Sequence, residues 1–192
     1  MSALPFLFGK APAHGDFIAR GLSEDEERAW DGWATREMDT ARERLGDRFD
    51  EAHDAAPPWG FVAREGAGWR AGALAASVDS AGRRFLLVMG YRAMSAEAGA
   101  FLGQAAAHAA EGVLRRSILE QLDADAAVAL LAELAPLPGD EAAAAALGAV
   151  AGADGVWWSL SGLVPPVISS EPPCGLVLAT LEQTADILGE AA

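Results

Sequence analysis

The chain has 192 residues, 52% of them hydrophobic, so a single domain can bury a core without a disulfide or a structural metal. Its 14 basic and 28 acidic residues give a formal net charge of −14, which argues against nucleic acid or an anionic membrane as a partner because both require clustered Lys and Arg. One cysteine excludes an intrachain disulfide, and without a bilayer-length apolar run or a signal-peptide pattern we expect a cytoplasmic protein with no membrane insertion.

The first elements are predicted from apolar runs and capping residues. Residues 4–9, LPFLFG, are typical of a strand, and a glycine-rich loop, GKAPAHGDFIARG, follows it to residue 21. Ser23 and Glu26 have capping-box spacing before a helix whose apolar stripe contains Trp30 and Trp33. Gly46 is expected to end this helix.

Three strands are predicted next. WGFVARE (59–65) and WRAGALAASV (69–78) are joined by a glycine-rich turn and form an expected hairpin. RFLLVMGY (84–91) is apolar throughout instead of alternating with polar residues, which is typical of a strand covered on both faces. We therefore place it near the centre of the sheet.

The rest of the chain is predicted to be mostly helical, with two strands. Helices are expected at about 95–122, 124–134 and 140–150, strands at 155–162 and 174–180, and a short helix after Thr180 and Gln183. This order does not alternate strand with helix, so it favours an α+β fold with a mainly antiparallel sheet packed by helices.

Catalytic and metal signatures are absent from the sequence. The loop lacks the P-loop pattern because Ala11 follows Gly9-Lys10, and neither a dinucleotide fingerprint nor G-x-S-x-G occurs. The three histidines do not have metal-ligand spacing: we expect His53 to be exposed and His108 to be partly buried. Cys174 is predicted to be a core residue at a strand end. No catalytic residue, cofactor or metal is assigned.

Fixed charges on two loops are the remaining candidates for function. The first loop carries Lys10, Asp16 and Arg20 between glycines that permit tight turns. Asp79 and Arg83 flank a second turn at Gly82 and are close enough in sequence to pair across it. These charges either brace the fold or contact a protein partner, and the sequence leaves both readings open.

Four stretches in this order resemble the TagF family, also called ImpM, of bacterial proteins associated with type VI secretion. They are FGKAPAHGDFIARGL, WDGWATREM, PPWGFV and SVDSAGRRF, and VWWSL is similar to a later strand of the family. The first matches the pattern F-G-K-x-P-x-x-G-D-F through Phe8, Gly9, Lys10, Pro12, Gly15, Asp16 and Phe17. The fourth matches S-V-D-x-x-G-R-x-F through Ser77, Val78, Asp79, Gly82, Arg83 and Phe85.

The resemblance implies a longin- or profilin-like domain, with an antiparallel sheet flanked by helices on both faces. We expect one domain over 1–192, strand-rich to about 92, helical over about 95–148, and ending in a strand pair and helix at about 155–190. It also implies a non-enzymatic regulator that restrains type VI secretion after translation by binding the forkhead-associated scaffold protein of that system.

Two hypotheses follow for the charged loops. In the first, Lys10, Asp16, Arg20, Asp79 and Arg83 are candidate contacts for the protein partner. In the alternative, the chain is a small hydrolase or nucleotide-dependent enzyme in which Lys10, His14 and Asp16 converge on a ligand. The oligomeric state is left open.

Overall fold

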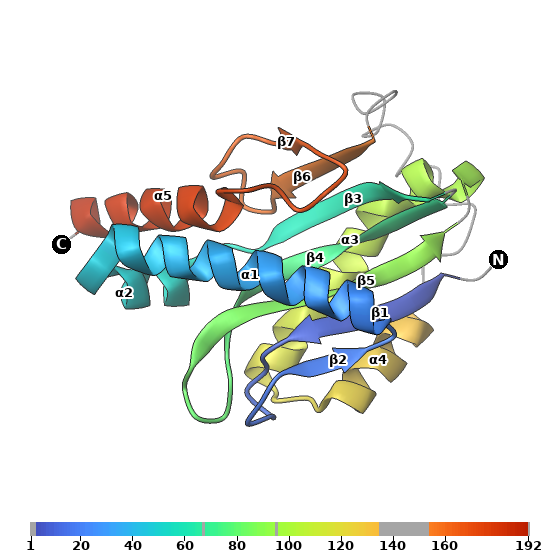
Figure 1. Cartoon of the computed structure of the whole chain (residues 1–192), viewed down its shortest axis with the longest axis horizontal. Helices are drawn as coiled ribbons and strands as arrows, with labels where there is room; N and C mark the ends of the chain where they lie inside the picture. The colour runs from blue at the N-terminus through green and yellow to red at the C-terminus, as the bar shows by residue number, and fades with distance from the viewer. Residues whose placement is uncertain (1–2, 67, 95, 135–153, 192) are drawn as a thin grey trace.

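A single antiparallel sheet organises the described chain. The computed structural model describes residues 3–66, 68–94, 96–134 and 154–191 (Figure 1). Its seven strands lie in the order β2-β1-β5-β4-β3-β6-β7, and every neighbouring pair is antiparallel. The strands are β1 (Leu4–Gly9), β2 (Ile18–Arg20), β3 (Trp59–Glu65), β4 (Gly68–Val78), β5 (Arg84–Met94), β6 (Gly155–Ser159) and β7 (Val167–Ile168).

Helices cover both faces of this sheet, as expected. They are α1 (Glu24–Leu45), α2 (Phe49–Ala55), α3 (Ala96–Leu119), α4 (Ala124–Glu133) and α5 (Leu176–Ala191), with a short 3₁₀ turn at Gly46–Arg48 between α1 and α2. Figure 1 shows α1, α2 and α5 in front of the sheet and α3 and α4 behind it. The α+β architecture predicted from the sequence is therefore confirmed.

The start and end of α1 follow the sequence signals. The Ser23 amide donates to the Glu26 carboxylate at 2.6 Å, and the Glu26 amide donates to Ser23 Oγ at 3.4 Å, which completes the capping box. At the other end Gly46 has φ +54°, a conformation that L side chains rarely adopt, and the helix stops there.

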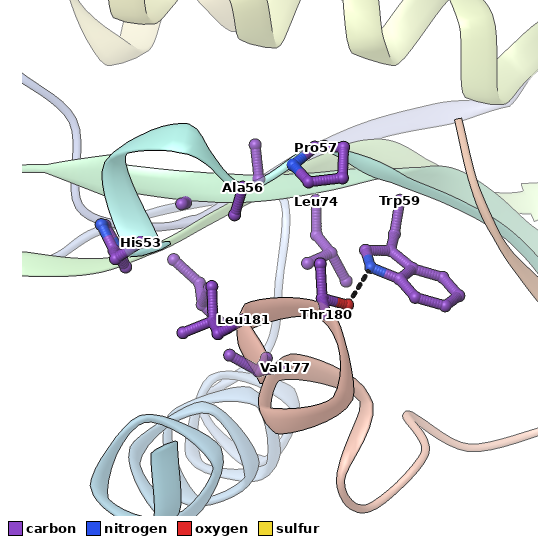
Figure 2. A pocket seen from close by; sticks show the side chains of 11 residues that line it. His53, Ala56, Pro57, Trp59, Leu74, Val177, Thr180 and Leu181 are labelled. Atoms are coloured by element: carbon purple, nitrogen blue, oxygen red, sulfur yellow. Dashed lines mark hydrogen bonds between the residues drawn. The ribbon is translucent and has the colours of Figure 1, made fainter. Parts of the chain in front are cut away.

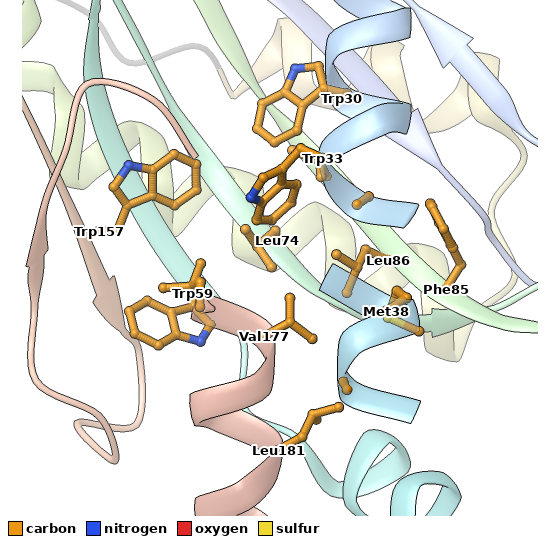
Figure 3. Packing of buried hydrophobic residues seen from close by; sticks show 14 of the residues in the cluster. Trp30, Trp33, Met38, Trp59, Leu74, Phe85, Leu86, Trp157, Val177 and Leu181 are labelled. Carbon is orange, nitrogen blue, oxygen red and sulfur yellow. The ribbon is translucent and has the colours of Figure 1, made fainter. Parts of the chain in front are cut away.

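The two faces of the sheet bury cores of different character. Aromatic rings dominate the front core: Trp30 and Trp33 of α1 lie near Trp157, with Trp59 beside α5 (Figure 3). The rear core is rich in alanine, and α3 lies close to the sheet through Ala106 and Ala110. From Leu86 onward the residues of β5 enter the two cores alternately, and all of residues 85–91 are buried, which confirms that this strand is covered on both faces.

The last third of the chain differs from the sequence prediction. Residues 174–180 are not a strand, because α5 begins at Leu176. The last strand is β7, inside the predicted loop, and it pairs with one side of β6, whose other side pairs with β3. The helical stripe of Leu176, Val177, Leu181 and Ala185 explains why this apolar run packs as a helix. Thr180 is inside α5, where its hydroxyl donates to the Leu176 carbonyl, so it does not cap a helix.

Two further elements were not predicted, and one predicted helix is not among the described residues. β2 forms within the first loop, and α2 forms between the first helix and the hairpin. The helix expected at 140–150 lies outside the described residues. Among the described helices, none combines the length and apolar character needed to cross a bilayer.

Candidate functional site

The two charged loops meet around Asp79. Lys10 Nζ lies 3.1 Å from Asp79 Oδ2, and Arg83 Nε donates to the same oxygen at 2.7 Å. Asp79 Oδ1 accepts the backbone amides of Ala81 at 3.0 Å and of Arg83 at 2.9 Å. We call Lys10, Asp79 and Arg83 the Asp79 network. The Asp79 carboxylate accepts four hydrogen bonds and closes the turn between β4 and β5.

Glycine brings Lys10 beneath this turn. Gly9, the last residue of β1, has φ +128°, and a Cβ there would lie 2.1 Å from the carbonyl oxygen of Leu86. The next amide, that of Lys10, donates to this Leu86 carbonyl at 3.0 Å. Only glycine permits so close an approach between β1 and β5, so Gly9 positions Lys10 toward Asp79.

Further hydrogen bonds join the two loops into one unit. The Ser80 amide donates to the His14 carbonyl at 2.8 Å, and Arg83 Nη2 donates to the Gly15 carbonyl at 2.5 Å. Arg83 therefore contacts both the turn that contains it and the loop after β1. Because loops held by such charge-assisted bonds lose little further conformational freedom on binding, they make effective recognition surfaces.

Burial and hydrogen bonding have opposite effects on the pKa of the Asp79 carboxyl. Burial, the largest influence, acts to raise the pKa of the Asp79 carboxyl, because the side chain is shielded from solvent. Hydrogen bonds from the Arg83 amide, Lys10, the Arg83 guanidinium and the Ala81 amide outweigh burial and hold the pKa well below its ordinary value. The carboxylate therefore stays charged at neutral pH, and it forms ion pairs with both Lys10 and Arg83.

His14 and Arg20 reach a different element. His14 Nε2 accepts the amide of Ala124, the first residue of α4, at 3.0 Å. Arg20 Nε donates to Asp125 Oδ1 at 2.7 Å, in the first turn of the same helix. Both side chains attach the first loop and β2 to α4.

Asp16 and Phe17 face solvent beside the Asp79 network. Asp16 Oδ1 accepts the Phe17 amide at 2.8 Å, and its side chain is exposed. The Phe17 ring is 45% exposed, yet it packs edge-on against Phe85 with ring centroids 4.9 Å apart. Lys10 Nζ lies 4.9 Å from the centre of the Phe17 ring. The aromatic ring is therefore held in place while part of it remains open to a partner.

These observations define a surface that we call the loop patch, made of the exposed residues Asp16, Phe17, Ser80, Ala81, Gly82 and Arg83. Of the five predicted contact residues, Asp16 and Arg83 lie on it. Lys10 and Asp79 are buried beneath it, and Arg20 is exposed but paired with α4. Phe17 was not among the predicted contacts: the sequence placed it only in the F-G-K-x-P-x-x-G-D-F pattern.

The side chains required by the enzyme alternative do not converge. Lys10 points inward to Asp79, His14 accepts from the backbone of α4, and Asp16 accepts from its own neighbour. Within the described segments, no three His, Cys, Asp or Glu side chains gather in a way that could hold a metal ion.

Three predictions outside the loops are wrong. His53 is only 1% exposed, because α2 turns it toward β5, where its Nε2 lies 2.9 Å from the Phe85 carbonyl oxygen. His108 is exposed on α3, and Cys174 is exposed in the loop before α5. The helical spacing of Phe49, Ala52 and His53 was the sequence signal that α2 buries one face.

The cavity beside His53 is small. Figure 2 shows it between α2, the sheet and α5, where Trp59 Nε1 donates to Thr180 Oγ1 at 2.8 Å. Its volume of about 20 Å³ is close to that of a single water site. It does not offer room for a substrate.

Comparisons with known proteins find one matching family and a solved structure with a similar fold. The family described as "TagF N-terminal domain, Type VI secretion system-associated" matches residues 7–134. The crystal structure of PA0076 from Pseudomonas aeruginosa PAO1 has a similar fold, with a TM-score of 0.69 over 92% of this chain and 93% of that one. The two sequences are 23% identical, so this likeness concerns the fold alone. A comparison with curated proteins finds no match.

Proposed function

The chain belongs to the type VI secretion system-associated TagF family, and on this premise we propose that it is a non-enzymatic regulator that restrains secretion by binding a protein. The proposed partner is the forkhead-associated scaffold protein of the secretion system. Restraint acts after translation, in the cytoplasm, by occupying the scaffold.

The observation that carries this proposal is the interlocking of the two loops that resemble family motifs. The F-G-K and S-V-D segments are 69 residues apart at Lys10 and Asp79, yet their side chains form one buried ion pair. Above that pair lies the loop patch, with an exposed carboxylate, a half-exposed aromatic ring and a guanidinium that is 57% exposed. An aromatic side chain beside charged groups has the composition of a binding hot spot.

The proposed roles of the five predicted residues differ accordingly. Asp16 and Arg83 contact the partner directly, together with Phe17. Lys10 and Asp79 act as positioning residues, because they are buried and fix the two loops. Arg20 contributes at the margin of the interface, where it is held by Asp125.

A secretion assay in the source bacterium tests this role. Deleting the gene should increase secretion of a type VI substrate into the medium, and the wild-type chain should restore restraint. A chain with Asp16→Lys and Phe17→Ala should fail to restore it at equal protein level. Asp186→Lys, which changes an exposed carboxylate on α5, is the matched control and should restore restraint.

Two results would count against the proposal. Unchanged secretion after deletion would remove the regulatory role. Full restraint by the Asp16→Lys, Phe17→Ala chain would remove the loop patch from the mechanism.

A further inference from the structure

A cleft lies beside α1, away from the loop patch. It has a volume of about 240 Å³. One wall is a stripe of α1 that spans roughly 15 Å at the helical rise per residue, and the others are Arg70 of β4 and the loop before α5. The lining residues are Glu26, Ala29, Trp30, Trp33, Arg36, Arg70, Glu171, Pro172 and Cys174.

Two tryptophans give the cleft a rigid apolar floor. The Trp30 and Trp33 side chains are 4% and 5% exposed, and their ring centroids lie 5.8 Å apart (Figure 3). Trp33 Nε1 donates to the Pro173 carbonyl at 3.2 Å, which fixes the loop wall against α1. The floor of the cleft and the loop beside it are therefore formed by packed groups.

Arg70 lacks good acceptors at this position. Its guanidinium lies over the Trp30 ring at 5.5 Å, and its side chain is 14% exposed. Arg70 Nε is buried and has no hydrogen-bond partner within the described residues. Its terminal nitrogens have only long contacts, at 3.3 Å to Ser170 and Glu171 and at 3.8 Å to Glu65. A largely buried guanidinium with such weak partners favours an additional acceptor.

The acidic residues of the cleft supply Arg70 with one weak acceptor, the Glu171 carboxylate at 3.3 Å. The Glu26 carboxylate is occupied by Arg92 at 2.7 and 2.8 Å and by the capping box of α1. Glu171 is 79% exposed at the rim. Arg36 is exposed and lies within 4 Å of no carboxylate in the described part of the chain.

We propose that this cleft binds a small carboxylate with a flat apolar body. The carboxylate accepts hydrogen bonds from Arg70 and Arg36, and the body lies against the edges of Trp30 and Trp33. The volume and the mixture of aromatic and cationic groups fit a ligand of this class. None of the lining residues belongs to the loop patch, so this site does not rest on the proposed function.

Cys174 provides a native reporter for the test, because it is the sole cysteine of the chain, is exposed and lines the cleft. The rate of its alkylation by neutral iodoacetamide is measured at constant ionic strength with phenylacetate, phenylacetamide or phenethylamine. These probes share the ring and differ in charge. Phenylacetate should slow alkylation several-fold with half-saturation in the millimolar range. The other two should need at least tenfold higher concentrations.

Variants identify the groups that hold the carboxylate. Arg70→Met should raise the half-saturating phenylacetate concentration at least tenfold, and Arg36→Gln at least threefold. Arg64→Met is the matched control, since Arg64 also stacks on a tryptophan, Trp69, but lies outside the cleft, and it should leave protection unchanged. Because Arg36 is exposed, Arg36→Gln remains decisive if Arg70→Met does not fold.

Three outcomes would overturn this proposal. The expected half-saturating concentration is roughly 1 mM. The first such outcome is that phenylacetate does not slow alkylation even at a concentration about 50-fold higher. Another is equal protection by phenylacetamide, which would make the interaction purely apolar. The third is unchanged protection in the arginine variants.

Discussion

The buried Asp79 carboxylate accepts four hydrogen bonds, and removing Asp79, Lys10 or Arg83 should lower the stability of the fold by unequal amounts. Two of its bonds come from backbone amides that form the turn, one from Arg83 and one from Lys10. An uncompensated buried charge is far more costly than the loss of one of several partners. The acceptor is therefore more important to stability than either cation.

Asp79→Asn should lower the melting temperature at pH 7 by on the order of 10 °C, because its NH₂ group faces the donors of Lys10 and Arg83. Lys10→Met should lower it by only about 3–5 °C, since Asp79 keeps three partners. Circular dichroism during heating measures both values. Asp16→Asn, which changes an exposed carboxylate on the same loop, is the control. Equal losses for Asp79→Asn and Asp16→Asn would contradict the assignment.

The Asp79 network also predicts a direction for pH dependence. The pKa of Asp79 is lower in the folded chain than its ordinary value of about 3.9, so the unfolded chain binds more protons as the pH falls through that value. The stabilisation is complete above about pH 5 and fades below about pH 4. The difference in urea midpoint between wild type and Asp79→Asn should be constant from pH 6 to 8 and narrow toward pH 3. A difference that widens on acidification would refute this assignment.

At this scale the sequence predicted part of the site. Pairing of Asp79 with Arg83 could be foreseen, because the two residues flank a three-residue segment that contains Gly82, whose φ is +77°. The contact with Lys10 could not, because it depends on β1 pairing with β5. The choice between bracing and recognition was a question of burial, which spacing alone does not reveal.

One buried glutamate on α1 organises the start of α5. Glu37 Oε1 accepts the Gly175 amide at 2.7 Å, and Oε2 accepts the Val177 amide at 3.0 Å. A carboxylate at a helix N-terminus satisfies amides that have no partner within the helix and interacts favourably with the helix dipole. Glu37 thus caps a helix about 140 residues away in sequence.

Glu37→Ala should destabilise the chain by about 2–3 kcal/mol, because it leaves the buried Val177 amide unsatisfied, removes the acceptor of the Gly175 amide and removes the charge at the helix terminus. Urea unfolding followed by tryptophan fluorescence measures this change. Glu43→Ala, at an exposed position of the same α1, should change stability by less than about 0.5 kcal/mol. A similar small effect for Glu37→Ala would show that the cap does not stabilise α5.

Because α3 packs closely against the sheet, two glycine substitutions in this helix should change the stability of the fold in opposite directions. A Cβ at Gly103 would lie 2.3 Å from Val62 Cγ2, whereas a Cβ at Gly112 of the same helix meets nothing within 4 Å. Gly103→Ala should destabilise the fold by about 1–3 kcal/mol through overpacking. Gly112→Ala should stabilise it by up to about 1 kcal/mol through helix propensity. Equal effects in urea unfolding would contradict the close approach.

At the scale of elements, the sequence was sufficient to predict a helix or strand whose signals lie within its own segment. The capping box of α1 and the uniformly apolar β5 are such cases, and both were predicted correctly. Only the first turn of α5 was predicted as a strand, with a helix after Thr180, because its apolar residues are consecutive there and its cap is supplied by the distant Glu37. β7 has only two residues and forms through pairing with β6, which a sequence pattern of that length does not reveal.

At the scale of the whole molecule, helices on both faces leave the loops at the sheet ends as exposed features with fixed charges. The loop patch joins the loop after β1 to the turn between β4 and β5, so its shape depends on the pairing of β1, β5 and β4. The cleft beside α1 lies on separate residues. Protein binding and ligand binding can therefore be tested by independent sets of variants.

Binding of the purified chain to the purified forkhead-associated scaffold of the same bacterium, measured by isothermal titration calorimetry, tests the central claim most directly. Wild type and Asp186→Lys should bind with equal affinity. The chain with Asp16→Lys and Phe17→Ala should bind at least tenfold more weakly, a loss of about 1.4 kcal/mol or more, while thermal unfolding shows that it is folded. Absence of binding by the wild-type chain, or equal affinity of the folded loop-patch variant, would contradict the account.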